Sequence, residues 1–475
     1  MDKFLVIYDV RGIQKYIFRT NKIREISGAS NIVQNKLIEL LKRVISNDEN
    51  IFKTKWEEMD FLFDENEKLL AEIIYIGGGN IVLAYRGDEL SLVDINKELQ
   101  KSFMKETYSL SLAFAYVKMT NSYKDDLRNV KAKLNNVKTR MPQLVMNQGL
   151  PIVAYDSLNG LPLSEYTYVG DEKKQVSKEA YLKLKEYKSN GEDELDVIAQ
   201  KDDRDNDKTM LAIVHIDGND IGAMISNYYD KTTIENDYSS QVKASREVSK
   251  KVNDTFTKSV IDSFNEKQIA YRIVINSGDD ITFICKAEYG ISITQKIIEK
   301  IEENSLSTYN FSACGGICMV HSHFPFYKAY EMAEDLCSNA KKQAKTNLLN
   351  NGRPSSYIDF DICQSGIIKP ILKTREENKE LYLRPYCISK ELEEKINDEH
   401  ISSFIKLTKL LDKNVARNVI KELRNKYQES TNNLNIYYEK IKSRNKLFQK
   451  FSPYNQSNVA TFYDACSMID LTDFK

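Results

Sequence analysis

The stretch that decides the fold is AIVHIDGNDIG at residues 212–222. It begins with the largely apolar run AIVHI, which Asp217 follows directly. Further along, residues 276–283 have the sequence NSGDDITF, which places Asp279 and Asp280 directly after a glycine. A short, β-branched apolar run predicts a buried strand, and glycine next to aspartate is typical of a tight turn. The sequence therefore predicts one carboxylate at the end of a strand and two more in the turn of a hairpin.

The N-terminal part repeats this arrangement with fewer carboxylates. In residues 4–13, FLVIYDVRGI, the apolar run FLVIY is followed directly by Asp9. Residues 76–83, IGGGNIVL, form a second glycine-rich hairpin candidate. Asp9 precedes the third turn glycine by 70 positions, compared with 62 positions between the corresponding residues of the second copy. We interpret the chain as two copies of one unit, of which only the second carries a set of carboxylates.

The order of predicted elements in each copy is strand, helix, hairpin, helix and strand, which is the order of a ferredoxin-like α+β unit of the palm type. In the first copy we expect a strand at 4–9, helical structure at 12–45 with either two helices or a kink at 28–30, a hairpin at 73–85, a helix at 90–105 and a strand at 110–117. The predicted fold class is α+β, with two ferredoxin-like palm domains, a helical insert and a C-terminal helical bundle.

Composition shifts divide the chain into four predicted domains. These are a first palm at 1–120, a helical or linker insert at 121–208, a second palm at 209–350 and a C-terminal helical domain at 370–475. Residues 200–208 are wholly polar, which predicts a solvated linker. After residue 370 the chain is rich in Lys, Glu, Leu and Ile, and residues 388–450 are predicted to be helical.

Bulk composition excludes few functions. The 475 residues carry a formal net charge of -1, so any contact with nucleic acid requires a local basic patch. Seven cysteines without a CxxC pair predict buried, reduced thiols rather than a zinc site. No apolar run approaches the roughly 20 residues that span a membrane, so we expect no membrane contact and a cytoplasmic protein.

The carboxylates suit divalent metal ions. Asp217 at the end of a central strand is expected within a few ångströms of Asp279 and Asp280 in the neighbouring hairpin. Hard oxygen ligands favour Mg²⁺ or Mn²⁺, and two such ions support nucleotidyl transfer. Gly278 would allow a phosphate to approach the backbone. The alternative is that Gly-Asp-Asp is only a tight turn. For Asp220 we favour a role as the cap of the following helix over a role as a metal ligand.

At this point the motifs resemble a known family. Residues 9–18, DVRGIQKYIF, and 24–30, REISGAS, are similar to the first palm of the polymerase-like large subunit of type III CRISPR effector complexes. Residues 217–222, DGNDIG, and 277–280, SGDD, are similar to its second palm, where the turn usually has the sequence GGDD. The resemblance implies synthesis of cyclic oligoadenylates from ATP, with Mg²⁺ or Mn²⁺, as messengers in antiviral defence.

The resemblance also implies roles for particular residues. Metal would be held by Asp217, Asp279, Asp280 and the carbonyl of Gly218, and two ATP molecules would bind between the palms. The nucleotide-binding residues would be Gly77, Gly78, Gly79, Asn80, Ser277, Gly278, Lys341 and Lys345. The two lysines either meet a triphosphate or lie on a solvated helix face. Implied partners are ATP, guide or target RNA, and other CRISPR effector subunits.

Two departures from the family narrow the expectation. The four histidines form no His-Asp pair, so we expect no DNase activity, and residues 152–160 lack the cysteines of a zinc segment. Two other functions remain open: a structural subunit of an RNA-guided complex, and a palm that senses a nucleotide without turnover. Clustered carboxylates repel one another and have no purpose in a scaffold, which favours the enzyme.

Overall fold

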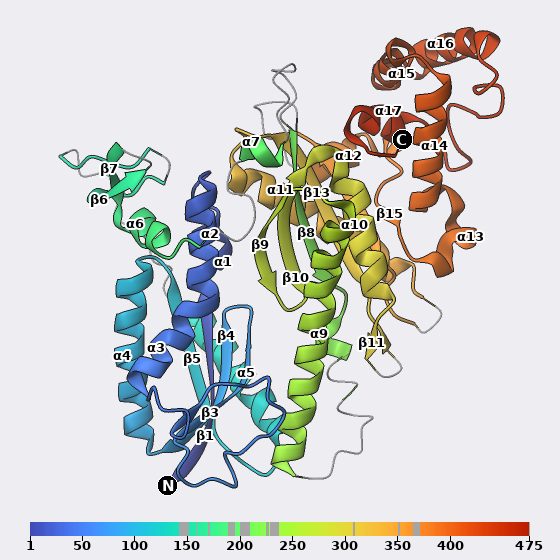
Figure 1. Ribbon diagram of the computed structural model, residues 1–475. Coiled ribbons are helices and arrows are strands. Elements are labelled where there is room, and N and C mark those ends of the chain that lie inside the picture. The colour runs from blue at the N-terminus through green and yellow to red at the C-terminus, as the bar shows by residue number, and fades with distance from the viewer. Residues whose placement is uncertain are drawn as a thin grey trace. The chain divides into compact units, whose positions relative to one another are not determined.

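The computed structural model describes residues 1–141, 152–157, 159–169, 172–188, 195–199, 210–224, 228, 237–306, 309–349, 352–363 and 371–474 (Figure 1). The chain forms two compact units. The first comprises Met1–Asp193, Ile221–Asp254 and Val274–Gly278, and the second comprises Glu194–Asp220, Thr255–Ile273 and Asp279–Lys475.

The first unit contains a five-stranded sheet in the order β2-β3-β4-β1-β5. Its strands are β1 (Asp2–Arg11), β2 (Phe52–Lys53), β3 (Ala71–Gly77), β4 (Asn80–Gly87) and β5 (Ser111–Lys118). The central strand β1 is buried from Phe4 to Val10 and pairs antiparallel with both β4 and β5. The strands predicted at 4–9 and 110–117 and the hairpin predicted at 73–85 are confirmed.

The helices of the first unit differ from the prediction near Gly28. They are α1 (Ile13–Ile17), α2 (Ile23–Asn31), a π-helical turn (Ile32–Lys36), α3 (Leu37–Val44), α4 (Glu89–Thr107) and α5 (Tyr123–Arg140). The helical region is divided, as predicted, but the break lies at 18–22 and not at 28–30, because α2 continues through Gly28 and passes into the π-helical turn at Ile32. A Cβ atom at Gly28 would lie 1.8 Å from the carbonyl oxygen of Lys183, so glycine is required here for helix packing and not for a break.

The insert contains strands that the sequence did not reveal. Its elements are β6 (Leu163–Val169), β7 (Glu172–Ser177), α6 (Lys178–Lys185) and α7 (Leu195–Ile198). The strands β6 and β7 form an antiparallel hairpin, and α6 packs on α2. The hairpin buries little apolar surface, since Tyr166 and Tyr168 of β6 are exposed and the first four residues of β7 are polar and exposed, so the sequence lacks the pattern of a half-buried strand. The polar run at 200–208 lies outside the described residues.

The second sheet repeats the topology of the first. Its order is β15-β14-β13-β8-β10-β9. The strands are β8 (Met210–Gly218), β9 (Tyr271–Ser277), β10 (Asp280–Lys286), β13 (Ala313–His321), β14 (Tyr357–Ile362) and β15 (Tyr386–Cys387). The succession β13-β8-β10-β9 corresponds to β5-β1-β4-β3 of the first sheet, so both sheets contain the ferredoxin-like core. The predicted double-palm α+β fold is confirmed.

Helices after the strands cover the second sheet. They are α9 (Tyr238–Lys267), α10 (Ala287–Glu302) and α11 (Phe326–Thr346), and a short hairpin pairs β11 (Ser305–Leu306) with β12 (Tyr309–Asn310). Helices α10 and α11 pack against β13 and β8. Apolar residues of α11, among them Tyr330, Leu336 and Cys337, are buried on this surface. The helix is thereby fixed beside the strand that ends in Asp217.

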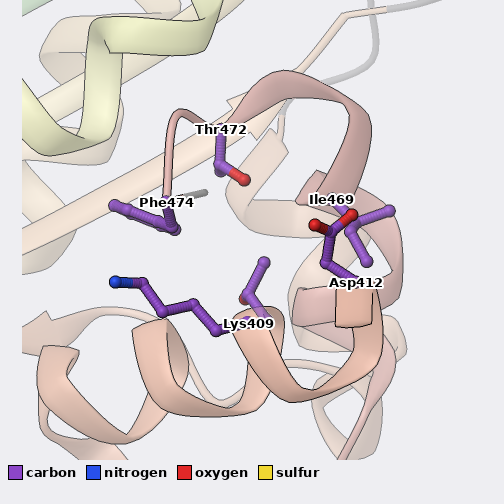
Figure 2. A pocket seen from close by; sticks show the side chains of 6 residues that line it. Lys409, Asp412, Ile469, Thr472 and Phe474 are labelled. Atoms are coloured by element: carbon purple, nitrogen blue, oxygen red, sulfur yellow. The ribbon is translucent and has the colours of Figure 1, made fainter. Parts of the chain in front are cut away.

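The C-terminal part is helical, as predicted for 388–450. Its helices are α12 (Ile371–Glu377), α13 (Glu393–Ile396), α14 (Ile401–Asn414), α15 (Arg417–Glu429), α16 (Thr431–Arg444) and α17 (Tyr463–Met468), with 3₁₀ turns at Lys379–Leu381, Lys390–Leu392, Asn397–Glu399 and Ile469–Leu471. A pocket of about 10 Å³ beside α14, lined by Lys409, Asp412 and Phe474 among others, has room for roughly one water molecule (Figure 2).

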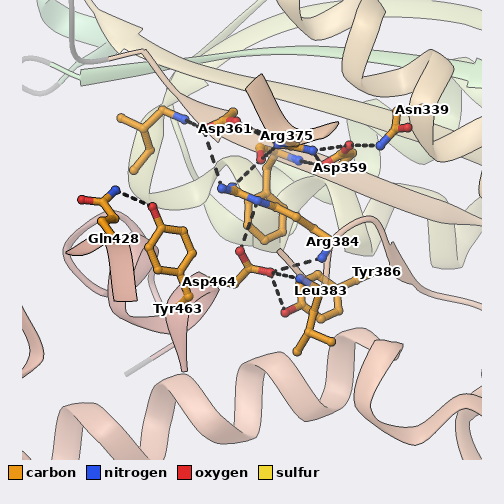
Figure 3. Close-up of polar contacts among 12 residues, drawn as sticks. Asn339, Asp359, Asp361, Arg375, Leu383, Arg384, Tyr386, Gln428, Tyr463 and Asp464 are labelled. Carbon is orange, nitrogen blue, oxygen red and sulfur yellow. Dashed lines mark hydrogen bonds and ion pairs between the residues drawn. The ribbon is translucent and has the colours of Figure 1, made fainter. Parts of the chain in front are cut away.

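A buried ionic network joins the C-terminal helices to β14 (Figure 3). Arg375 donates to both carboxylate oxygens of Asp359 at 2.7 Å, and its guanidinium also reaches Asp361 at 2.9 Å. Arg384 lies 3.2 Å from Asp464 of α17. Buried charges are tolerated only when they are paired, so the network specifies how α12 and α17 attach to the sheet.

The predicted burial of the cysteines is confirmed for six of the seven. All seven are free, six are buried, and Cys363 is partly exposed. Across the residues that the structure describes, no helix has the length and apolar character to cross a lipid bilayer.

Candidate functional site

Asp217 and Asp280 are brought together by strand register. Asp217 is the penultimate residue of β8, Asp280 is the first residue of β10, and the two are direct partners across the antiparallel pair. Directly opposed residues have their Cβ atoms about 4.5–5.5 Å apart. The backbone N–H of Gly218 donates to the carbonyl of Asp279 at 3.1 Å, which closes the end of the pair. The sheet therefore places two of the predicted site carboxylates side by side.

The hairpin turn provides space as well as charge. Ser277 ends β9, and Gly278 adopts a positive φ of 69°, a conformation that glycine accepts without strain. A Cβ atom at Gly278 would meet no described atom closer than 3.9 Å. Asp279 follows in the second central position of the turn. The open surface at Gly278 fits the predicted approach of a phosphate to the backbone.

Lys341 of α11 contacts the site directly. Its Nζ lies 2.6 Å from Asp217 Oδ2 and donates to the carbonyl of Gly218 at 2.9 Å. Burial acts to lower the pKa of Lys341, but the carboxylate of Asp217 outweighs it and raises that pKa. Lys345, one turn further along α11, is exposed. The predicted phosphate-binding lysine thus contacts two of the predicted metal ligands.

The pKa values of both carboxylates at the turn are raised above the ordinary value for aspartate. Burial, followed by repulsion from Asp217 and Asp279, raises the pKa of Asp280 to about 8. Burial and repulsion from Asp217 raise the pKa of Asp279 to about 6. The side chain of Asp280 is 36% exposed, but its Oδ1 atom is buried and accepts no hydrogen bond among the described residues. A buried carboxylate oxygen without a donor is a position that a cation would stabilise.

His215 and Thr282 complete the surroundings of Asp280 and were missed by the sequence analysis. His215 Nδ1 lies 3.2 Å from Thr282 Oγ1 and 3.4 Å from Asp280 Oδ1. Burial lowers the pKa of His215 to about 4, so the ring is neutral at pH 7. Strand alternation could have identified both residues, because each lies two positions from a site aspartate and faces the same side of the sheet.

The segment after Gly218 is fixed by buried hydrogen bonds. The N–H of Asn219 donates to the carbonyl of Ser312 at 2.9 Å, and its side chain donates to the carbonyl of Ser355 at 2.9 Å. Asp220 is exposed and has a φ of 51°. Its predicted role as a helix cap stays a prediction.

A divalent metal fits part of the predicted ligand set. Across the described part of the chain, no group of three or more His, Cys, Asp or Glu side chains is arranged to hold a metal ion. The cationic Nζ of Lys341 nevertheless contacts Asp217 Oδ2 and the Gly218 carbonyl, and Asp280 lies in register beside Asp217. Carboxylate and carbonyl oxygens suit Mg²⁺ or Mn²⁺. The participation of Asp279 stays a prediction.

The first palm repeats this arrangement without the two carboxylates of the turn. Asp9 pairs in register with Asn80, and the N–H of Val10 donates to the carbonyl of Gly79 at 3.0 Å. Lys138 of α5 forms an ion pair with Asp9, as Lys341 does with Asp217. The helix that carries Lys138 packs on β1 and β5, although the sequence placed it in the insert.

The space predicted for a nucleotide at the first turn is partly filled by the chain itself. A Cβ atom at Gly77 would lie 2.0 Å from the hydroxyl of Tyr75, and one at Gly79 would lie 2.7 Å from the side chain of Ile13. These glycines accommodate neighbouring side chains. The nucleotide-binding role of Gly77, Gly78, Gly79 and Asn80 stays a prediction.

In the described part of the chain, the fold and site define a double-palm protein in which the second palm, unlike the first, carries neighbouring carboxylates at the end of its central strand pair. Residues 210–350 match the family model of Cas10/Cmr2, second palm domain. That segment contains Asp217, Asp279, Asp280 and Lys341. The resemblance to the large subunit of type III CRISPR effector complexes, predicted from the motifs, is thus confirmed for the second palm.

Solved structures extend the similarity of fold to the whole chain. A chain of the crystal structure of the Csm1–Csm4 cassette in complex with cA4 aligns with a TM-score of 0.54 at 12% identity, covering 100% of this chain and 70% of that chain. A chain of the same cassette in complex with pppApA aligns with a TM-score of 0.52 at 12% identity, covering 98% and 69%. The comparison with curated protein sequences found no match.

Proposed function

We propose that this protein is a metal-dependent nucleotidyltransferase that makes cyclic oligoadenylate-type second messengers from ATP in CRISPR-associated antiviral defence. The observation that carries the proposal is the charge of the second-palm site. Asp217 and Asp280 oppose each other in register and Asp279 follows in the turn, and burial together with repulsion among the three carboxylates raises the pKa values of Asp279 and Asp280 to about 6 and 8. A bound Mg²⁺ or Mn²⁺ ion offsets the repulsion among these carboxylates.

We assign a role in this reaction to each of the site residues of the second palm. Asp217, Asp280 and the carbonyl of Gly218 would hold the metal, and Asp279 is proposed as a further ligand. Bound metal supplies Lewis acidity to the α-phosphate and activates the attacking 3′-hydroxyl. Gly278 leaves room for the phosphate beside the backbone. His215, which is neutral and buried beside Asp280, adds no positive charge that would compete with the metal.

The similar structures support the choice of substrate. The two reported neighbours are Csm1–Csm4 cassettes in complex with cA4 and with pppApA. We extend to this chain adenine nucleotides as ligands and other CRISPR effector subunits as partners. We also propose guide or target RNA as a partner, and that Lys345 and the turn at 77–80 contact nucleotide.

The enzyme is tested by product analysis. Purified protein is incubated with each nucleoside triphosphate and Mg²⁺ or Mn²⁺, with and without a complex of the effector subunits and target RNA, and products are analysed by mass spectrometry. We expect a cyclic oligoadenylate from ATP. The double variant Asp279→Ala plus Asp280→Ala should make no product while its circular dichroism spectrum is unchanged.

A matched control is Asp262→Ala, which removes an exposed carboxylate from α9. This variant should retain activity. Failure of the wild-type protein to form product from any triphosphate under every condition would contradict the enzyme and favour a structural subunit or a nucleotide sensor. Product formation by the double variant would contradict the site.

A further inference from the structure

Lys341 occupies a position that a metal ion would require. Its Nζ is 2.6 Å from Asp217 Oδ2 and 2.9 Å from the carbonyl oxygen of Gly218. The side chain of Lys341 is 26% exposed, so this contact is only partly screened by water. The carboxylate oxygen of Asp217 and the carbonyl oxygen of Gly218, both predicted metal ligands, therefore already contact an internal cation.

A divalent ion and the ammonium group compete for these oxygens. Mg²⁺ binds oxygen at about 2.0–2.1 Å and requires nearly octahedral geometry. An ammonium group that stayed on Asp217 Oδ2 would then lie within a few ångströms of the metal, and the two positive charges would repel each other. Binding of the metal at Asp217 and Gly218 consequently requires Lys341 to move away.

The first palm has an equivalent lysine–aspartate pair in which the two charges balance. Lys138 pairs with Asp9, and the residue opposite Asp9 in the sheet is the neutral Asn80. One lysine and one aspartate cancel. In the second palm the residue opposite Asp217 is Asp280, so the pair with Lys341 leaves negative charge uncompensated. The same lysine position thus neutralises one palm fully and the other only in part.

We propose that Lys341 is an internal counter-ion that a divalent cation displaces, and that the displaced ammonium group pairs with the polyphosphate of the bound nucleotide. The inference rests on the metal site of the proposed function and adds a regulation of that site. The metal alone must compete with Lys341, whereas nucleotide offers Lys341 another anion. Metal and nucleotide therefore bind with positive coupling, and each raises the affinity of the other by the same factor.

The test measures binding rather than turnover. Mn²⁺ is titrated into the full-length protein without nucleotide, and free Mn²⁺ is followed by electron paramagnetic resonance. Lys341→Met removes the competing charge while it keeps a long, flexible side chain, and we expect it to bind Mn²⁺ about tenfold more tightly than the wild type. Lys341→Arg keeps a cation and should bind Mn²⁺ no more tightly than the wild type.

The control is Lys342→Met, which removes an exposed positive charge from the adjacent position of α11. It should leave the affinity for Mn²⁺ unchanged. An affinity of Lys341→Met that equals or falls below that of the wild type would overturn the inference, as would an equal increase for Lys341→Met and Lys341→Arg. Thermal unfolding of each variant checks that the fold is retained.

A second titration measures the coupling. In the presence of a non-hydrolysable ATP analogue at a concentration corrected for its own Mn²⁺ complex, the wild type should bind Mn²⁺ about tenfold more tightly than without it, and Lys341→Met should lose most of this gain. An undiminished gain in Lys341→Met would contradict the transfer of Lys341 to the polyphosphate. Absence of Mn²⁺ binding in every variant would contradict the metal site itself, and therefore the proposed function, whereas Mn²⁺ binding that is indifferent to Lys341 would contradict only this inference.

Discussion

The first and second palms place an aspartate, a hairpin turn and a lysine at equivalent positions, yet their charges differ. Asp9 faces Asn80 and pairs with Lys138, whereas Asp217 faces Asp280 and pairs with Lys341. The backbone hydrogen bond that closes each strand pair is nearly identical, at 3.0 Å and 3.1 Å. A shared backbone therefore supports a neutral site in one palm and an anionic site in the other.

The two turns also differ in backbone conformation. Both central residues of the first turn, Gly78 and Gly79, have positive φ values of 63° and 75°, which is the pattern of a type I′ turn. In the second turn Gly278 has a φ of 69°, and Asp279 is not among the described residues with positive φ, as in a type II′ turn. The second turn can therefore carry a side chain where the first requires glycine.

The largest expected difference between the palms is catalytic. Asp217→Asn should lower the rate of product formation about a thousandfold, because the metal loses a ligand that stabilises charge in the transition state. The matched variant Asp9→Asn should stay within a few-fold of wild type. Initial rates of product formation at saturating ATP and Mn²⁺ make the comparison. Equal losses in the two variants would contradict the division of roles.

The next effect concerns the turns. Gly79→Asp should lower the free energy of unfolding by about 2 kcal/mol, because it forces positive φ on a residue with a Cβ atom that would lie 2.7 Å from Ile13. The reciprocal variant Asp279→Gly should change that free energy by less than about 1 kcal/mol. Urea unfolding of both variants tests the expectation. A larger loss for Asp279→Gly would show that the turns do not differ as described.

A smaller effect is expected in the dependence of stability on pH without metal. The folded protein holds protons on Asp279 and Asp280 up to pKa values of about 6 and 8, above the ordinary value of 3.8. Because these two carboxylates bind more protons in the folded state than in the unfolded state, they should make stability fall as pH rises from about 4 to 8 and level off above pH 8. Between about pH 4 and 6.5 the fall is partly offset by His215, whose pKa burial lowers from 6.5 to about 4.

Thermal unfolding in EDTA from pH 4 to 9 measures this dependence. The slope should be reduced in Asp280→Asn, and Mn²⁺ should stabilise the wild type most at high pH. The corresponding first-palm variant Asn80→Ala should keep the wild-type slope. A stability difference between wild type and Asp280→Asn that is independent of pH would contradict the shifted pKa of Asp280.

The smallest effect is expected for the lysine of the first palm. Lys138→Met leaves the buried carboxylate of Asp9 without its cation and should lower the free energy of unfolding by about 1 kcal/mol. It should leave the affinity for Mn²⁺ unchanged, in contrast to Lys341→Met. Isothermal titration with Mn²⁺ and urea unfolding provide the two measurements, and tighter Mn²⁺ binding by Lys138→Met would mean that the first palm also holds metal.

Local sequence patterns predicted the framework of the site. The apolar runs before Asp9 and Asp217 predicted the central strands, and glycine-rich segments predicted the hairpin turns, because strand burial and turn formation depend on neighbouring residues. Topology then predicted that Asp217 lies beside the second turn. These features follow from short-range patterns and from one rule of strand order.

Contacts between distant segments were not accessible in the same way. The sequence suggested that Lys341 meets a phosphate or solvent, but its distance to Asp217 depends on the packing of α11 against the sheet. Likewise, Gly28 suggested a helix break, and only its closeness to Lys183 of α6 shows why glycine is needed. His215 and Thr282 were overlooked because each is unremarkable within a buried strand.

The central claim is that the second palm binds catalytic metal and the first does not. Titration of Mn²⁺ into Asp217→Asn and Asp9→Asn, followed by electron paramagnetic resonance, tests it most directly. We predict that Asp217→Asn loses Mn²⁺ binding while Asp9→Asn binds as the wild type does. Retained binding in Asp217→Asn, or its loss in Asp9→Asn, would contradict the claim.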